Sequence, residues 1–193
     1  MRALVVYESM YGNTHAVAVS IAAGLSTRHD VTLVPVTRAT PELVAAADLL
    51  VVGGPTHLHR MSTAASRRWA ADAARKQGSP LTMDPDADGP GVRGWLEGAG
   101  GLGSLGGLGG LGGQNTLAVA FDTRLGGAPL FTGRASRGIS RLLAGHGCRM
   151  LAAPESFLVS KRDTLRDGEA DRARAWGAMI GAAASDLYTP TVA

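Results

Sequence analysis

The sequence predicts a doubly wound α/β fold, in which a parallel β-sheet carries helices on both faces. Short apolar runs of strand length alternate repeatedly with segments of helical periodicity. The runs are rich in β-branched residues, which is typical of parallel strands buried on both faces. Polar or glycine-containing loops follow three of the runs, and ligands of such sheets bind beyond the carboxyl ends of the strands.

Length and composition indicate one globular domain over residues 1–193. The formal net charge is +3, with 17 Arg against 2 Lys. This mild basicity is weak evidence for a nucleic-acid partner, so none is expected.

Cys148 is the single cysteine, which excludes an internal disulfide, and we expect it to be buried. No apolar run approaches the roughly 18 residues of a membrane span, and the start does not resemble a signal peptide. We therefore expect a cytoplasmic protein without a membrane span.

The first predicted strand covers residues 3–8, and a helix follows over residues 13–27. Val17, Ile21 and Leu25 recur at helical spacing in this segment, and Asn13 or Thr14 can cap its start.

The second predicted strand, residues 31–36, alternates apolar and polar side chains, which suits a sheet edge. A short helix begins at Pro41, and a third strand over residues 49–52 ends in a loop from Gly53 onward. The Ala-rich segment 62–77 is predicted to be helical.

Residues 92–97 have room for one or two helical turns, and low-complexity sequence follows them. Ten of residues 98–113 are Gly, so we expect a flexible loop there. The fourth strand covers residues 116–122, and residues 123–133 form the loop after it.

Residues 134–144 are predicted to form a helix that leads to a fifth strand over residues 149–160, interrupted by Pro154. The last helix covers residues 169–187. The three tryptophans lie on helical stretches, and core packing is the expected role for Trp69, Trp95 and Trp176.

The chemistry of the chain gathers in the loop after the first strand, residues 9–14, hereafter the 9–14 loop. Ser9, Gly12, Asn13 and Thr14 place hydroxyls, an amide and a flexible backbone at a helix N-terminus, which favours a bound anion. An ordinary capped helix start is the alternative interpretation. Because the loops at 55–62 and 122–133 leave the same edge of the predicted sheet, their convergence favours a phosphate site.

These residues carry a family resemblance. Glu8-Ser9-Met10-Tyr11-Gly12-Asn13-Thr14 resembles the phosphate loop of flavodoxin-like proteins, which is usually written Thr/Ser-x-Thr-Gly-x-Thr. Gly53-Gly54-Pro55-Thr56 is similar to the family's first flavin-flanking loop, and Phe121-Asp122-Thr123-Arg124 occupies the position of the second. The resemblance implies a five-stranded parallel sheet of order 2-1-3-4-5 and flavin mononucleotide (FMN) as the cofactor.

The resemblance also implies a set of site residues. Ser9, Thr14 and the backbone from Met10 through Tyr11 and Gly12 to Asn13 would hold the phosphate. The flavin would lie between Pro55, Thr56, His57 and Leu58 on one side and Asp122, Thr123 and Arg124 on the other. Both flanking loops lack Trp and Tyr, so His57 or Leu58 and residues 123–125 are the expected neighbours of the ring.

The absence of other motifs excludes several kinds of binding site. The 9–14 loop contains neither Gly-Lys-Ser/Thr nor Gly-x-Gly-x-x-Gly, which argues against a nucleoside triphosphatase and a dinucleotide fold. His57 and His59 are too few ligands for a metal site, and no metal is expected.

Arginines distinguish this chain from the acidic electron-carrier flavodoxins. We expect Arg124 to stabilise the reduced, anionic flavin. Arg134, Arg137 and Arg141 share one helix face. They are either a solvated surface or a docking site for an acidic redox protein or for the phosphates of NAD(P)H.

The sequence is compatible with three alternative functions. The first is an FMN-binding, flavodoxin-like redox protein that transfers electrons to a partner. The second is an NAD(P)H-dependent quinone reductase that uses FMN, since residues 7–12 are similar to the tryptophan-repressor-binding-protein type of that enzyme. The third is a flavodoxin-like scaffold that has lost flavin and binds a protein or an anion.

Overall fold

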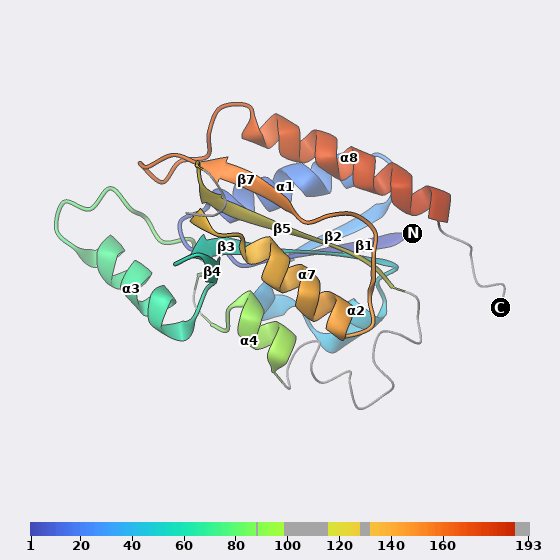
Figure 1. Cartoon of the computed structure of the whole chain (residues 1–193), viewed down its shortest axis with the longest axis horizontal. Helices are drawn as coiled ribbons and strands as arrows, with labels where there is room; N and C mark the ends of the chain where they lie inside the picture. Colours follow the sequence, from blue (N-terminus) through green and yellow to red (C-terminus); the bar gives the residue numbers. More distant parts are fainter. Residues whose placement is uncertain (88, 99–115, 128–131, 188–193) are drawn as a thin grey trace.

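The computed structural model describes residues 1–87, 89–98, 116–127 and 132–187. Its parallel sheet has the order β2-β1-β3-β5-β6, with β7 also paired to β5 (Figure 1). Because β6 and β7 together replace the fifth predicted strand, the expected order 2-1-3-4-5 is confirmed. The strands are β1 (Arg2–Tyr7), β2 (Asp30–Pro35), β3 (Leu49–His57), β4 (Arg60–Met61), β5 (Leu117–Leu125), β6 (Arg149–Met150) and β7 (Glu155–Val159).

Helices cover both faces of the sheet. On one face lie α1 (Asn13–Leu25) and α8 (Glu169–Leu187), and on the other lie α2 (Pro41–Ala45), α4 (Val92–Glu97) and α7 (Ala135–Gly145) (Figure 1). A 3₁₀ turn, η1 (Val36–Arg38), joins β2 to α2. A further helix, α3 (Ala64–Arg75), extends from one end of the sheet.

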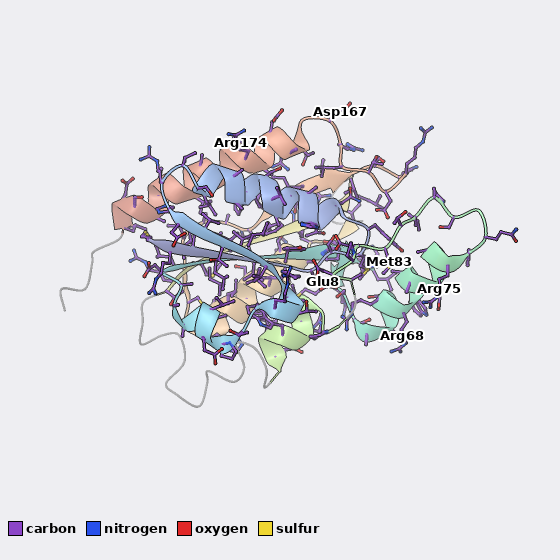
Figure 2. The ribbon with its side chains drawn as sticks, turned by 180° about the vertical axis from the view of Figure 1, so that it is seen from behind. Glu8, Arg68, Arg75, Met83, Asp167 and Arg174 are labelled. Carbon is purple, nitrogen blue, oxygen red and sulfur yellow. The ribbon has the colours of Figure 1, made fainter. Side chains whose placement is uncertain are left out.

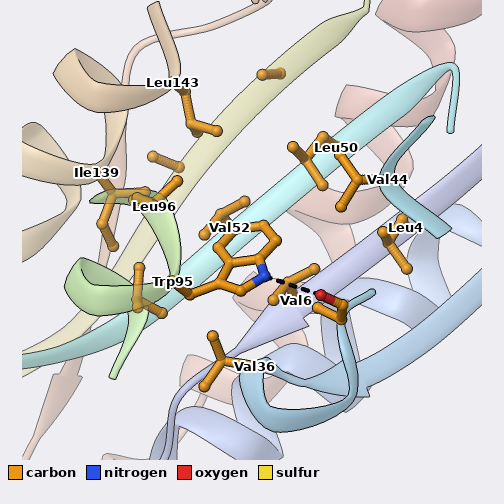
Figure 3. Packing of buried hydrophobic residues seen from close by; sticks show 14 of the residues in the cluster. Leu4, Val6, Val36, Val44, Leu50, Val52, Trp95, Leu96, Ile139 and Leu143 are labelled. Atoms are coloured by element: carbon orange, nitrogen blue, oxygen red, sulfur yellow. Dashed lines mark hydrogen bonds between the residues drawn. The ribbon is translucent and has the colours of Figure 1, made fainter. Parts of the chain in front are cut away.

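Two hydrophobic clusters separate according to the pleat of the strands. Leu4 and Val6 of β1 join the cluster beneath α2, α4 and α7, whereas Val5 joins the cluster beneath α1 and α8. Successive side chains of a strand point to opposite faces, which produces this alternation. Trp95 lies within the first cluster, where its indole Nε1 donates a hydrogen bond of 2.9 Å to the carbonyl oxygen of Ala39 (Figure 3).

Helices α1 and α8 are in close backbone contact through glycines. A Cβ at Gly24 would overlap the carbonyl oxygen of Arg174, and a Cβ at Gly177 would overlap that of Ile21. The missing side chains therefore let the two helices approach, which fixes the position of α1 and of the 9–14 loop in front of it.

Two predicted strand ends are wrong, because β3 and β5 are longer than expected. Strand β3 continues past Val52 to His57, and β5 continues past Asp122 to Leu125. Parallel pairing between these two strands extends to Pro55 and Thr123, and β7 supports β5 up to Leu125. The predicted fifth strand is split, and residues 151–154, which include Pro154, form no strand. Of the predicted flexible loop at 98–113, all but Gly98 lies outside the described residues.

Burial confirms most of the predicted core residues. Trp95 and Trp176 are buried, and so is Cys148, the pKa of which burial raises to about 11. The prediction for Trp69 is wrong: its side chain on α3 is 62% exposed, because α3 buries Ser66 and Ala70 instead. Within the described residues, the helices are too short or too polar to cross a bilayer.

Candidate functional site

A cavity of about 400 Å³ opens at the carboxyl ends of β1, β3, β5 and β7. The 9–14 loop borders it from one side, and the ends of β3 and β5 border it from the other. Ten of the thirteen predicted site residues line the cavity: Met10, Tyr11, Asn13, Thr14, Pro55, Thr56, His57, Leu58, Thr123 and Arg124. The structure therefore brings together three loops that are far apart in sequence.

Five further lining residues were not predicted: Leu81, Val159, Ser160, Lys161 and Asp163. Four of them come from the end of β7 and the loop after it. Their position at the same sheet edge is a consequence of parallel topology, which is a signal that could have identified them. Leu81 belongs to an irregular segment, and no sequence pattern indicates its place.

The 9–14 loop leaves the start of α1 without a side-chain cap. Gly12 is the N-cap residue at φ 88°, and its side-chain-free backbone adopts this left-handed conformation readily. The N–H of Gly12 donates to Ser9 Oγ at 3.1 Å, which closes the loop. Asn13 and Thr14 do not cap the helix as predicted, so the first N–H groups of α1 have no helical acceptor and remain available to an anion.

Side chains of the 9–14 loop tie it to three neighbouring elements. The Asn13 side-chain amide donates to the carbonyl oxygen of Asp163 at 2.9 Å, and the Tyr11 hydroxyl donates to that of Ala70 on α3 at 3.0 Å. The hydroxyl oxygens of Thr14 and Thr123 lie 2.7 Å apart. These bonds hold the loop in place.

Glu8 is a buried acidic residue directly before the loop, at the end of the sheet from which α3 extends (Figure 2). One oxygen accepts a short hydrogen bond from the Ser62 hydroxyl, and the other accepts the N–H of Val92 at 2.8 Å. Arg67 donates to the same Ser62 hydroxyl at 3.2 Å. Glu8 therefore fastens β1 to the starts of α3 and α4 and does not line the cavity.

The opposite end of the cavity carries two aliphatic side chains. A tight hairpin joins β3 to β4, with Leu58 at φ 45° and His59 at φ 71°, a conformation that is strained for non-glycine residues. Leu58 is 66% exposed and Leu125 is 50% exposed, although both line the cavity. The cavity therefore presents two uncovered aliphatic side chains, one from each flanking loop.

Burial governs the charges of the two titratable groups at the strand ends. It lowers the pKa of His57, which favours the neutral imidazole. Burial raises the pKa of Asp122, opposed by the hydrogen bond of 2.7 Å from the N–H of Ser136. Asp122 is fully buried and is not among the residues that line the cavity, so its place beside a ligand stays a prediction.

Arg124 borders the cavity with 7% of its surface exposed. Its Nη1 donates to the carbonyl oxygen of Gly127 at 2.9 Å and to Thr132 Oγ1 at 2.8 Å. Burial lowers its pKa, partly offset by Asp122, but guanidinium groups stay protonated in proteins. Arg124 therefore supplies a fixed positive charge and ties Gly127 and Thr132 to the end of β5. Arg134, Arg137 and Arg141 line a separate cavity.

Comparisons with known proteins agree with this geometry. The flavodoxin family model matches residues 5–116, which is more than half of the 193-residue chain. No curated protein matches the sequence significantly.

Solved structures resemble the chain over nearly its whole length. A flavodoxin from the domain Archaea is 17% identical, with a TM-score of 0.59, and the match covers 96% of this chain and 99% of that one. Oxidised flavodoxin 1 from Bacillus cereus is 14% identical, with a TM-score of 0.62 and coverage of 98% and 100%. A WrbA-like flavodoxin from Agrobacterium tumefaciens is 18% identical, with a TM-score of 0.57 and coverage of 97% and 99%. At these identities the likeness is one of fold.

Proposed function

Because the chain belongs to the flavodoxin family, we propose that the cavity at the sheet edge binds FMN and that the protein passes electrons from it to a redox partner. One observation carries the proposal. A single cavity joins an uncapped helix N-terminus at one end to uncovered aliphatic side chains at the other. FMN has the same polarity, with a phosphate at one end and a flat ring at the other. The flavin would supply the electron-transfer chemistry.

The phosphate end fits a dianion through neutral donors. The backbone N–H groups of Asn13 and Thr14 stand at the positive end of the α1 dipole, and Ser9 and Gly12 give the loop its shape. Met10 and Tyr11 of the same loop line the cavity, and the Tyr11 hydroxyl donates to the carbonyl oxygen of Ala70 on α3. A cavity of about 400 Å³ lies within the size range of small-molecule sites.

The ring end would hold the isoalloxazine between Leu58 and Leu125. Burying their exposed surfaces against a flat ligand contributes roughly 25 cal/mol per Å² of apolar area. Pro55, Thr56 and Thr123 complete the walls, and neutral His57 adds a polar edge without a charge.

The experiment is a calorimetric titration of the flavin-free chain with FMN and with riboflavin. Riboflavin lacks the phosphate, so we expect FMN to bind at least roughly 100-fold more tightly, the equivalent of one or two charge-assisted hydrogen bonds. Equal affinity for the two ligands, or no binding of FMN, would contradict the proposal. Steady oxidation of NAD(P)H with a quinone by the FMN-loaded protein would identify an enzyme instead of an electron carrier.

Arg124 provides a second test. Its positive charge favours negative charge on a neighbouring flavin, so we expect Arg124→Gln to lower the midpoint potential of the bound flavin. Arg124→Lys keeps the charge and loses the bonds of the guanidinium fork, so its potential should stay near that of the wild type. A potential in Arg124→Gln that is unchanged or higher would remove Arg124 from this role.

A further inference from the structure

A second cavity, of about 370 Å³, lies between α4, α7 and β4. It is separate from the cavity that we propose binds FMN, hereafter the FMN cavity, and five of its lining residues are arginines against one acid. The lining residues are Arg60, Met61, Arg93, Glu97, Arg134, Arg137, Gly138, Arg141 and Leu142. We call it the arginine cavity.

The charges of this cavity are largely uncompensated. Arg93 lies 3.6 Å from Glu97, but within the described residues no carboxylate is in ion-pair range of the other four arginines. Like charges gathered in a concave site repel one another and create a positive potential that attracts anions. An anion in the cavity would therefore remove a repulsion that the protein alone retains.

Two of the five arginines carry a buried donor. The Nε atoms of Arg93 and Arg134 are buried, and neither has a hydrogen-bond partner in the part of the chain that the structure describes. A buried donor without a partner is energetically unfavourable. Both side chains are half-buried and line the cavity.

We propose that the arginine cavity binds a small anion that carries two or more adjacent phosphates. Guanidinium groups bind phosphate oxygens in pairs, and arginines from three separate elements surround this cavity. Met61, Gly138 and Leu142 add an apolar wall that suits the rest of a nucleotide. The acidic face of a partner protein would contact exposed Arg60, Arg137 and Arg141 but not half-buried Arg93 and Arg134. The inference does not depend on the binding of FMN.

The test uses inorganic pyrophosphate as the probe, titrated calorimetrically into the full chain at constant ionic strength. We expect binding that weakens roughly 10-fold in each of Arg137→Gln and Arg141→Gln, the effect of one charge-assisted hydrogen bond. Both side chains are exposed, so their loss should leave the fold intact. The matched control is Arg174→Gln, on the opposite face of the sheet in α8, which should bind as the wild type does (Figure 2).

Excess FMN distinguishes this site from the 9–14 loop, which also attracts phosphates. Pyrophosphate binding that persists in excess FMN and responds to the Arg137 and Arg141 substitutions supports the proposal. Binding that FMN abolishes while both substitutions leave it unchanged would assign the probe to the 9–14 loop and overturn the proposal. Absence of pyrophosphate binding, or retention of polyglutamate alone, would also overturn it.

Discussion

The hydroxyl oxygens of Thr14 and Thr123 share a hydrogen bond of 2.7 Å that joins the start of α1 to the end of β5. Both side chains are buried, and they come from opposite walls of the FMN cavity. This bond fixes the distance between the loop expected to hold the phosphate and the strand expected to flank the ring.

Thr14→Val should weaken FMN binding about 10-fold and lower the free energy of unfolding by about 1–3 kcal/mol, because Thr123 keeps a buried hydroxyl without its partner. Thr14→Ser retains the hydroxyl and should stay near the wild type in both respects. FMN titration and urea denaturation measure the two effects. If the Val and Ser variants behave alike, the hydrogen bond does not organise the site.

Gly24→Ala should destabilise the fold by about 1–3 kcal/mol, since its methyl group would overlap the backbone of α8 at Arg174. Gly145→Ala is the matched control. That glycine also lies in a helix, but a Cβ there would meet nothing within 4 Å, so no loss is expected. Urea denaturation of the two variants separates the close contact from the general effect of replacing glycine. Equal stability of the two would disprove the proposed contact.

Asp122→Asn should stabilise the protein at neutral pH. Burial raises the pKa of Asp122 above its ordinary value of 3.8, so the folded protein holds this proton more tightly than the unfolded chain does. The carboxyl therefore lowers the free energy of unfolding as the pH rises from 3.8 through the folded-state pKa. Asn retains an oxygen for the Ser136 N–H and carries no charge.

Melting temperatures of Asp122→Asn between about pH 3 and 8 test this expectation, with a gain of roughly 2–4 °C for each kcal/mol. The gain should vanish below the unfolded-state pKa, where both states are protonated. Asp167→Asn, at an exposed position, is the control and should show no such pH-dependent gain. A gain that is equal at every pH would contradict the assignment to Asp122 ionisation.

The order of the strands and the meeting of three loops could be predicted from sequence, because parallel topology brings carboxyl ends to one edge. The ends of the strands could not. Gly53 suggested a loop, yet in the sheet it makes room for the ring of Phe121 on the neighbouring strand, since a Cβ there would overlap that ring. A glycine that accommodates a neighbouring strand has no local signature that distinguishes it from a glycine in a turn.

The hairpin at Leu58 and His59 could not be predicted from the sequence for a related reason. Two-residue hairpin turns with positive φ usually carry Asn or Gly, and neither residue type occurs there. Trp69 shows the complementary error, because an aromatic residue at helical spacing is buried only if its helix packs with that face inward. Helix α3 packs otherwise, and tertiary contacts decided the outcome.

The β3–β4 hairpin is a partition between the two cavities. Thr56 and His57 of β3 line the FMN cavity, and their cross-strand partners Met61 and Arg60 line the arginine cavity. If each cavity binds its ligand, the shared hairpin can couple the two binding equilibria, and this coupling is the same in both directions. Whatever factor a bound polyphosphate applies to the dissociation constant of FMN, FMN applies to that of the polyphosphate. A factor of one, measured by titrating each ligand with and without the other, would show that the partition is rigid. Any other factor would make the flavin responsive to the supply of phosphorylated metabolites.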